Sequence, residues 1–303
     1  MDGFTKLFTA TMLMQLVESG NISLNDDVRK YVPELKYTID EPEACKITLL
    51  QLATHTSGLS RNVPADLGFA KKVDKWMLTG EEVKTIDMST KEEFVRSLKY
   101  VEREYPEYQS RRYGDRNYSN MGYSLLGIAL ERAIDTDYEH YVLQNICRPL
   151  KMYDSGFLDP DGGNKEMVIG YSFYNEVFTR TPVFIPNSAI YAGGIYSTAI
   201  DLAKFISSQF GKSSDKNEKI LSECHRSMMQ TFSIGWKPAY PLVLHEGSML
   251  GFCSVLVISP EHKVGWVILT NTTDFEFSRI NAMFGELILP IFSKKLLRIL
   301  IDM

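Results

Sequence analysis

The segment 242-LVLHEGSMLGFCSVLVISPEHKVGWVIL-269 decides the fold class of this 303-residue chain. Its β-rich runs, at residues 242–244, 252–258 and 264–269, are separated by short turns, and residues 232–236 form a similar run just before them. Strands this close along a chain pair in antiparallel fashion, because a parallel connection needs a crossover of a dozen or more residues. The last third of the chain is therefore predicted to form an antiparallel sheet.

Helical spacing dominates the rest of the chain. Apolar residues between positions 8 and 17 repeat at that spacing, with Lys6 in the first turn and Gly20 as the C-cap. Shorter strand-like runs occupy residues 157–190. Further helices are predicted at residues 26–33, 47–52, 91–102, 121–133, 138–146 and 197–210. The pattern as a whole predicts an α+β fold.

We expect a single domain over residues 1–303, which is an ordinary length for one large domain. Residues from about 20 to 190 are expected to form a helical subdomain, and residues 1–19 and 191–303 the part associated with the sheet. Residues 60–115 are irregular and are interpreted as a variable insertion over a cleft, since long irregular segments in compact domains are usually functional or disordered.

Bulk composition narrows the choice of partners. The net charge of -5 argues against nucleic acid as the main partner. The four cysteines lie far apart with no metal-ligand spacing, so we expect free thiols, no metal and no cofactor, with disulfides left open. No signal peptide and no membrane-spanning stretch is visible in the sequence as written. The compartment stays unknown, with the cytoplasm as a default.

The apolar segment 287–301 is expected to form a terminal helix packed on the sheet. Pro290 interrupts the segment, and basic residues alternate with apolar ones after it. Those charges leave a second possibility open, which is a basic amphipathic helix on a membrane surface.

Three short strings carry residues of catalytic type: Gly3-Phe4-Thr5-Lys6, Tyr118-Ser119-Asn120 and His245-Glu246-Gly247. Each is a weak signal alone, because a single tyrosine is more often a core or surface residue. In this order and spacing, however, they resemble the three active-site elements of the serine β-lactamase and penicillin-binding-protein family, in its class C-related branch. The similarity extends over nearly the whole chain, through residues 6–26, 47–59, 118–127, 148–152, 192–199 and 245–271.

The resemblance implies a β-lactamase/DD-peptidase-like fold and acyl transfer through a serine ester. Esters, β-lactams and D-amino-acid peptides are the substrate classes that it implies. In the family a helix dipole and a lysine favour the serine alkoxide, and backbone N–H groups form the oxyanion hole. By position, the resemblance implies these roles: Lys6 as the helix lysine, Tyr118 as the base and acid, Asn120 as the amide that positions substrate, His245 as the strand cation or donor, Gly247 as the residue that admits substrate, and the Ser248 N–H as an oxyanion donor.

The chain departs from the family at the nucleophile. The serine would fall at position 3, where Gly3 stands and cannot be acylated. Thr5 would point about 200° away around the helix, and Thr9 lies on the wrong side of Lys6. We therefore expect acyl transfer to be nearly absent, because losing a nucleophile removes several orders of magnitude of rate. Whether the chain is an enzyme stays open. The alternatives are a non-catalytic binding protein that keeps the cleft, or a truncated relic.

A second departure concerns the sheet. The resemblance implies two more strands before position 3, pairing with the run at residues 264–269. Without them that run would be a long apolar edge, which invites pairing with another chain. An upstream start of the gene product, or of its ancestor, explains both departures most simply.

The remaining polar residues have simpler interpretations. His55 is expected to satisfy backbone groups near a helix end, with catalysis as a lesser alternative, and Asp201 to begin a helix. Tyrosines 105, 108 and 113 either line the cleft mouth or cover apolar surface. Histidines 140, 225 and 262 show no paired ligand spacing.

Overall fold

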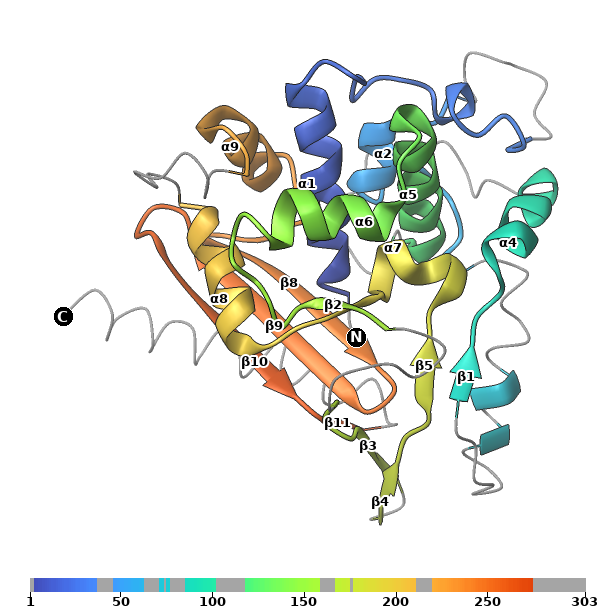
Figure 1. Cartoon of the computed structure of the whole chain (residues 1–303), viewed down its shortest axis with the longest axis vertical. Coiled ribbons are helices and arrows are strands. Elements are labelled where there is room, and N and C mark those ends of the chain that lie inside the picture. Colours follow the sequence, from blue (N-terminus) through green and yellow to red (C-terminus); the bar gives the residue numbers. More distant parts are fainter. Residues whose placement is uncertain are drawn as a thin grey trace.

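The structure is a computed structural model that describes residues 3–36, 46–62, 71–73, 75–76, 85–101, 118–158, 167–174, 177–210 and 220–274. Figure 1 shows most of the helices gathered on one side of an antiparallel sheet, with two smaller groups of strands at the lower end. The α+β prediction is confirmed. The expected terminal helix at residues 287–301 lies outside the described residues, as do Cys45 and tyrosines 105, 108 and 113.

The main sheet has the strand order β10-β9-β8-β7, and all its pairs are antiparallel. Within it His245 pairs with Leu256, and Gly247 pairs with Ser254. Among the described residues β10 pairs with β9 alone, while α8 packs against it. The strands are β7 (Lys237–Ala239), β8 (Leu242–Met249), β9 (Phe252–Ser259) and β10 (Val264–Thr270).

The run at residues 232–236 is not the strand that its composition predicts. Ser233 and Gly235 have φ angles of 59° and 78°, which no extended strand accommodates. A Cβ on Gly235 would lie 2.8 Å from the Cβ of Ala10. This segment is therefore a turn that approaches α1 closely, and the pairing strand begins only at Lys237.

Most predicted helices are present, with shifted ends. The boundaries are set by capping side chains, such as the reciprocal hydrogen bonds of Thr48 and Gln51 at α2 and of Thr90 and Glu93 at α4. Gly20 follows α1 with φ 75°, as a C-terminal glycine does. The helices are α1 (Thr5–Glu18), η1 (Val28–Lys30), α2 (Leu49–Ala53), α4 (Lys91–Ser97), η3 (Leu98–Tyr100), α5 (Asn120–Ile134), α6 (Tyr138–Val142), η6 (Leu143–Cys147), η7 (Asn187–Ala189), α7 (Ile190–Gly193), α8 (Ala199–Ser208) and α9 (Glu223–Thr231).

Three small sheets complete the described strands. One of them places β1, from the segment predicted to be an irregular insertion, parallel to β5. The described part of that segment is therefore structured where it contacts the rest of the chain. The pairs are β1 (Thr85–Asp87) with β5 (Val183–Ile185), β2 (Gly156–Phe157) with β6 (Ile195–Tyr196), and β3 (Tyr171–Tyr174) with both β4 (Val177–Arg180) and β11 (Thr272–Asp274).

Helix α1 lies at the centre of the core. Every residue from Thr5 to Met14 is buried, so the helix is covered on all sides by its neighbours. α7, α5, α6 and α9 all contact it, and the ring of Phe8 stacks on that of Phe205 in α8 at 4.6 Å. A polar residue at the start of this helix is therefore placed inside the protein. This burial positions Lys6.

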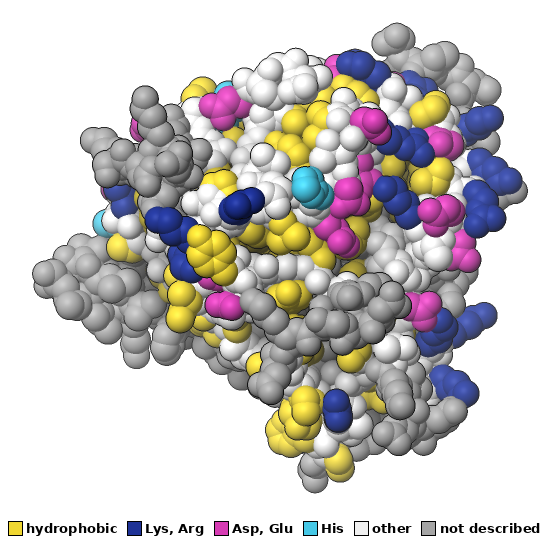
Figure 2. Space-filling model, in the orientation of Figure 1, with side chains coloured by type: hydrophobic (Ala, Val, Ile, Leu, Met, Phe, Trp, Pro, Cys, Tyr) yellow, Lys and Arg dark blue, Asp and Glu magenta, His cyan; other side chains and the backbone are white. Residues whose placement is uncertain are grey.

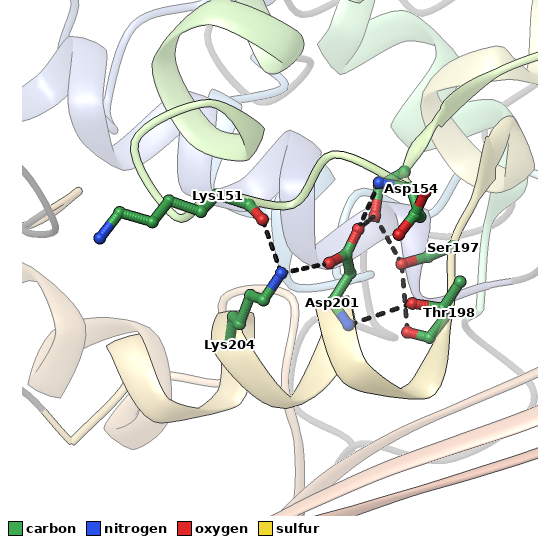
Figure 3. Close-up of polar contacts among 7 residues, drawn as sticks. Lys151, Asp154, Ser197, Thr198, Asp201 and Lys204 are labelled. Carbon is green, nitrogen blue, oxygen red and sulfur yellow. Dashed lines mark hydrogen bonds and ion pairs between the residues drawn. The ribbon is translucent and has the colours of Figure 1, made fainter.

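Asp201 does more than begin a helix. Its backbone N–H donates to Thr198 Oγ1, as expected for the start of α8. Its carboxylate, 1 % exposed as a residue, also accepts from the Asp154 N–H at 2.8 Å and from Ser155 Oγ at 3.0 Å. Lys204 donates to it at 2.7 Å (Figure 3). The Asp201 side chain therefore links the turn at residues 151–155 to α8 through hydrogen bonds.

The visible surface carries charges of both signs. Figure 2 shows basic and acidic side chains interspersed over the face in view, with apolar side chains between them and at its lower end. Val177, Phe178 and Val183, from β4 and β5, are exposed apolar residues. No helix in the described ranges is long and apolar enough to span a bilayer.

Candidate functional site

Gly3 lies directly against strand β8. A Cβ atom built on Gly3 would lie 2.8 Å from the Glu246 carbonyl oxygen, 3.2 Å from the Gly247 Cα and 3.3 Å from His245 Nε2. The Gly3 carbonyl accepts from the Lys6 N–H at 3.0 Å, which forms the turn that leads into α1. The first and third motifs, more than 240 positions apart, are therefore in contact.

Lys6 joins the first motif to the second. Its side chain enters the core from the first turn of α1, and the residue is 1 % exposed. Its Nζ donates to the Ala192 carbonyl at 2.9 Å and lies 4.8 Å from the ring centroid of Tyr118 and 5.6 Å from that of Tyr123. The ammonium therefore lies over the face of the Tyr118 ring.

The second motif is fixed by the start of α5. Ser119 is the N-cap, and its Oγ accepts from the Gly122 N–H at 2.8 Å. The same Oγ donates to the Ser60 carbonyl at 2.7 Å. Asn120 donates from its backbone N–H to the Arg61 carbonyl at 2.9 Å and from Nδ2 to Asn62 Oδ1 at 3.3 Å. Residues 60–62 therefore lie alongside this motif.

His245 faces α1 as a neutral imidazole. The residue is 3 % exposed, and its Nδ1 lies 2.7 Å from the Gly235 carbonyl oxygen, which only a protonated Nδ1 satisfies. Burial, and then the charge of Lys6, lower the pKa of His245 to about 4. Near neutral pH the imidazole is therefore neutral, whereas the sequence led us to expect either a cation or a donor at this position. Nε2, buried and directed at Gly3, is left as an acceptor.

Ser248 lies one residue beyond the contact with Gly3. It pairs with Cys253 across the sheet, and the Cys253 Sγ lies 3.6 Å from Ser248 Oγ. Gly247 is the β8 residue whose Cα directly faces position 3. The structure thus gathers Gly3, Lys6, Tyr118, His245 and Gly247. Asn120 and Ser248 lie next to members of this group along the chain.

Two nearby side chains were not assigned to the site from the sequence. The His55 ring lies 4.5 Å from that of Tyr118, centroid to centroid, and the Arg61 guanidinium lies 5.2 Å from the Tyr118 centroid. The sequence places His55 in one of the stretches that carry the resemblance, but nothing in that stretch indicates a contact with Tyr118. Arg61 has no sequence signal.

Within the described residues no group of three or more His, Cys, Asp or Glu side chains is arranged to hold a metal ion. Cys147, Cys224 and Cys253 are free thiols. Burial raises the pKa of the Cys147 thiol to about 12, so this cysteine is an unreactive core residue.

Comparison with known proteins agrees with this geometry. A sequence model described as Beta-lactamase matches residues 4–288. The chain is 26 % identical over 281 residues to Protein flp of Staphylococcus aureus (strain N315), covering 88 % of this chain and 51 % of that protein. It is 32 % identical over 203 residues to Beta-lactamase-like protein 2 of Dictyostelium discoideum, covering 67 % of this chain and 34 % of that protein. The chain spans about half the length of the Staphylococcus relative.

A solved structure shares the fold. The octameric penicillin-binding protein homologue from Pyrococcus abyssi superposes with a TM-score of 0.68 at 28 % identity, covering 95 % of this chain and 64 % of that one. Together with the family match, this establishes a β-lactamase/DD-peptidase-like fold. The chain belongs to the beta-lactamase family.

Proposed function

We propose that this chain is a serine-hydrolase-type member of its family whose acyl-transfer site is assembled but impaired by glycine at the nucleophile position. The substrates that the scaffold would take are esters, β-lactams or D-amino-acid peptides. Lys6 and Tyr118 are the proposed catalytic groups, with Asn120, His245, Gly247 and Ser248 contacting substrate. One observation carries the proposal, namely that Gly3 lies between Lys6 and the backbone of β8, where the family would have its serine.

Several features of the arrangement support this proposal. A hydroxyl group on residue 3 would start at the N-terminus of α1, one helical turn before Lys6, where the helix dipole favours a developing alkoxide. The Lys6 ammonium lies over the Tyr118 ring, 4.8 Å from its centroid, so the two groups proposed for proton transfer are neighbours at this site. The Cα of Gly247 would lie 3.2 Å from a Cβ on residue 3, so the backbone of β8 directly faces the nucleophile position.

The absence of a hydroxyl group at position 3 is the reason for the proposed impairment of acyl transfer. Glycine supplies no oxygen to attack a carbonyl, and the Thr9 hydroxyl is occupied by the Tyr191 carbonyl at 2.6 Å and the Tyr138 hydroxyl at 2.7 Å. The Thr5 hydroxyl accepts from the Ile195 N–H at 3.1 Å, on the far side of the helix. Neither threonine is therefore placed to substitute for the serine.

Covalent labelling tests the proposal directly. The unmodified protein, Gly3→Ser and Gly3→Ala are each treated with a fluorescent penicillin and with a fluorophosphonate, and turnover of a chromogenic ester is followed in parallel. We expect labelling and ester turnover for Gly3→Ser alone. Gly3→Ala is the matched control, because it introduces the same Cβ beside Glu246 without the hydroxyl.

The outcomes separate the alternatives. Labelling of the unmodified protein would contradict the impairment. A Gly3→Ser protein that is folded yet unlabelled would remove the acyl-transfer proposal and favour a non-catalytic protein that binds a peptide-like or ester-like ligand at the same site. That second candidate rests on the same glycine, since a binding site needs no nucleophile.

We further propose self-association through the free edge of β10. Among the described residues this strand pairs only with β9, and the Pyrococcus relative is octameric. Light scattering coupled to size exclusion tests it, with Leu269→Lys, at an exposed position on β10, expected to shift an oligomer towards monomer. A monomeric unmodified protein would exclude it.

In the domain division that we propose, residues from about 20 to 190 form the helical part.

A further inference from the structure

His55 lies where the chain leaves α2 and meets the start of α5. It follows the helix by two residues and is 4 % exposed. Its φ angle is 57°, a left-handed conformation that is unusual for a residue other than glycine, although histidine and asparagine adopt it more often than most. The neighbouring bonds, from Thr56 N–H to the Gln51 carbonyl at 2.9 Å and from His55 N–H to the Leu52 carbonyl at 3.4 Å, close the helix end. The backbone therefore directs this ring inward.

The imidazole packs against two aromatic rings, one on α5 and one just before that helix. Its centroid lies 4.5 Å from that of Tyr118 and 5.0 Å from that of Tyr123, at interplanar angles of 33° and 42°. The Tyr123 hydroxyl donates to the Ala53 carbonyl at 2.7 Å, which ties the second ring back to α2. These ring contacts therefore join two segments that are more than sixty residues apart.

A hydrogen bond fixes the same junction independently. The backbone N–H of Ser119, the residue after Tyr118, donates to His55 Nδ1 at 3.1 Å. An imidazole that accepts at Nδ1 and is neutral carries its proton on Nε2. Burial first, and then the charges of Lys6, His245 and Arg61, hold the pKa of His55 well below its usual range. The neutral tautomer that this bond requires is thus the stable form near neutral pH.

We propose that His55 is a positioning residue, which holds the Tyr118 ring beside Lys6 by packing against it and by accepting the Ser119 N–H. The inference rests on the proposed function only in treating Tyr118 as a site residue. Lys6 lies 4.8 Å from the Tyr118 centroid, so a change in the tilt or position of this ring changes the geometry between ammonium and phenol. If His55 only ended helix α2, neither its ring contact with Tyr118 nor its hydrogen bond with the Ser119 N–H would be needed.

The test asks whether replacing His55 in the full chain loosens only the junction between α2 and α5 or the whole protein. Amide hydrogen exchange is measured by NMR for the unmodified protein, for His55→Asn and for His140→Asn. Asparagine tolerates the left-handed backbone but offers no ring. His140 is exposed on α6 and serves as the control. We expect Ser119 to exchange about tenfold faster in His55→Asn, with Leu126 in the middle of α5 unchanged, because only the junction is released.

Two further measurements complete the test. In the unmodified protein, imidazole ¹⁵N spectra should show the Nε2–H form of His55 without titration from roughly pH 5.5 to 8. If Gly3→Ser turns over an ester, adding His55→Asn should lower kcat about tenfold with KM changed less than about threefold, because misplacing a catalytic group acts on the transition state.

The results discriminate clearly. Unchanged exchange at Ser119, equal acceleration along all of α5, or an unchanged kcat in an active Gly3→Ser background would each overturn the positioning role. If Gly3→Ser has no activity, the proposed function fails, while the exchange and ¹⁵N results still decide whether His55 holds this junction.

Discussion

A Cβ atom on Gly3 would lie 2.8 Å from the carbonyl oxygen of Glu246, closer than real Cβ atoms approach a backbone oxygen. The start of α1 and strand β8 are therefore packed against each other at a distance that only glycine permits. A serine at this position requires the strand or the helix start to move by several tenths of an ångström. Glycine here both removes the attacking group and narrows the gap in which it would act.

This contact predicts that Gly3→Ala destabilises the protein by about 1–3 kcal/mol, as other overpacking substitutions do. Gly193→Ala is the matched control, because a Cβ there would meet only the terminal methyl of Met249 at 3.7 Å. Urea unfolding followed by fluorescence measures both. Equal stability of the two variants would contradict the close packing.

The charge of Lys6 is predicted to govern the titration of His245. Lys6 is the second cause, after burial, of the lowered pKa of His245, whereas Lys237 is the last. Replacing Lys6 by Met removes a positive charge that disfavours the protonated imidazole. The His245 pKa should therefore rise by roughly one pH unit while staying below its usual value.

Proton NMR of the His245 ring follows this titration. Lys237→Met is the comparison and should give the smaller rise. A His245 titration that moves equally in both variants, or in neither, would show that Lys6 does not control it.

Acid is predicted to destabilise the fold through its buried histidines. His245 takes up a proton near pH 4 in the folded chain and near its ordinary value of 6.5 in the unfolded chain. Between these pH values the unfolded state binds more protons than the folded state. The contribution of His245 to the free energy of unfolding is therefore fully present above about pH 6.5 and is lost as the pH falls towards 4. The contribution from His245 is on the order of 2–3 kcal/mol by pH 4, and His55 acts in the same direction.

Unfolding free energies measured at several pH values, for the unmodified protein, His245→Gln and His140→Gln, check this dependence. His245→Gln should flatten the acid slope, and His140→Gln, at an exposed position, should leave it unchanged. An identical slope in all three proteins would assign the acid sensitivity to other groups.

Asp201 is predicted to be a stability residue. Its carboxylate accepts from the Asp154 N–H and from Ser155 Oγ, so Asp201→Ala removes an acceptor from both, although Ser155 Oγ also lies 2.7 Å from Ser197 Oγ. We expect a loss of about 2–4 kcal/mol. Lys204→Met removes a partner whose side chain is 38 % exposed and leaves the other hydrogen bonds of Asp201 in place, so it should cost less than Asp201→Ala. Thermal and urea unfolding compare the two, and the reverse order would contradict this assignment.

Most of the architecture follows from local sequence patterns. The closely spaced apolar runs predicted the pairing of β8, β9 and β10, and helical spacing with capping residues predicted α1, α5 and α8. The failure at residues 232–236 has a physical cause. Composition favours a strand there, but the positive φ angles at Ser233 and Gly235 form because the turn packs against α1, which composition does not encode.

The sequence by itself determined the family, through three motifs in order, and it determined that position 3 carries no hydroxyl group. It could not determine the state of the groups around that position. The neutrality of His245 depends on burial and on the charge of Lys6, and the packing of His55 against Tyr118 depends on the meeting of α2 and α5; both arise only when distant segments pack together. The sequence motifs show which chemical groups are present. The protonation states of these groups and the distances between them are set by the dielectric and steric surroundings that the tertiary structure creates.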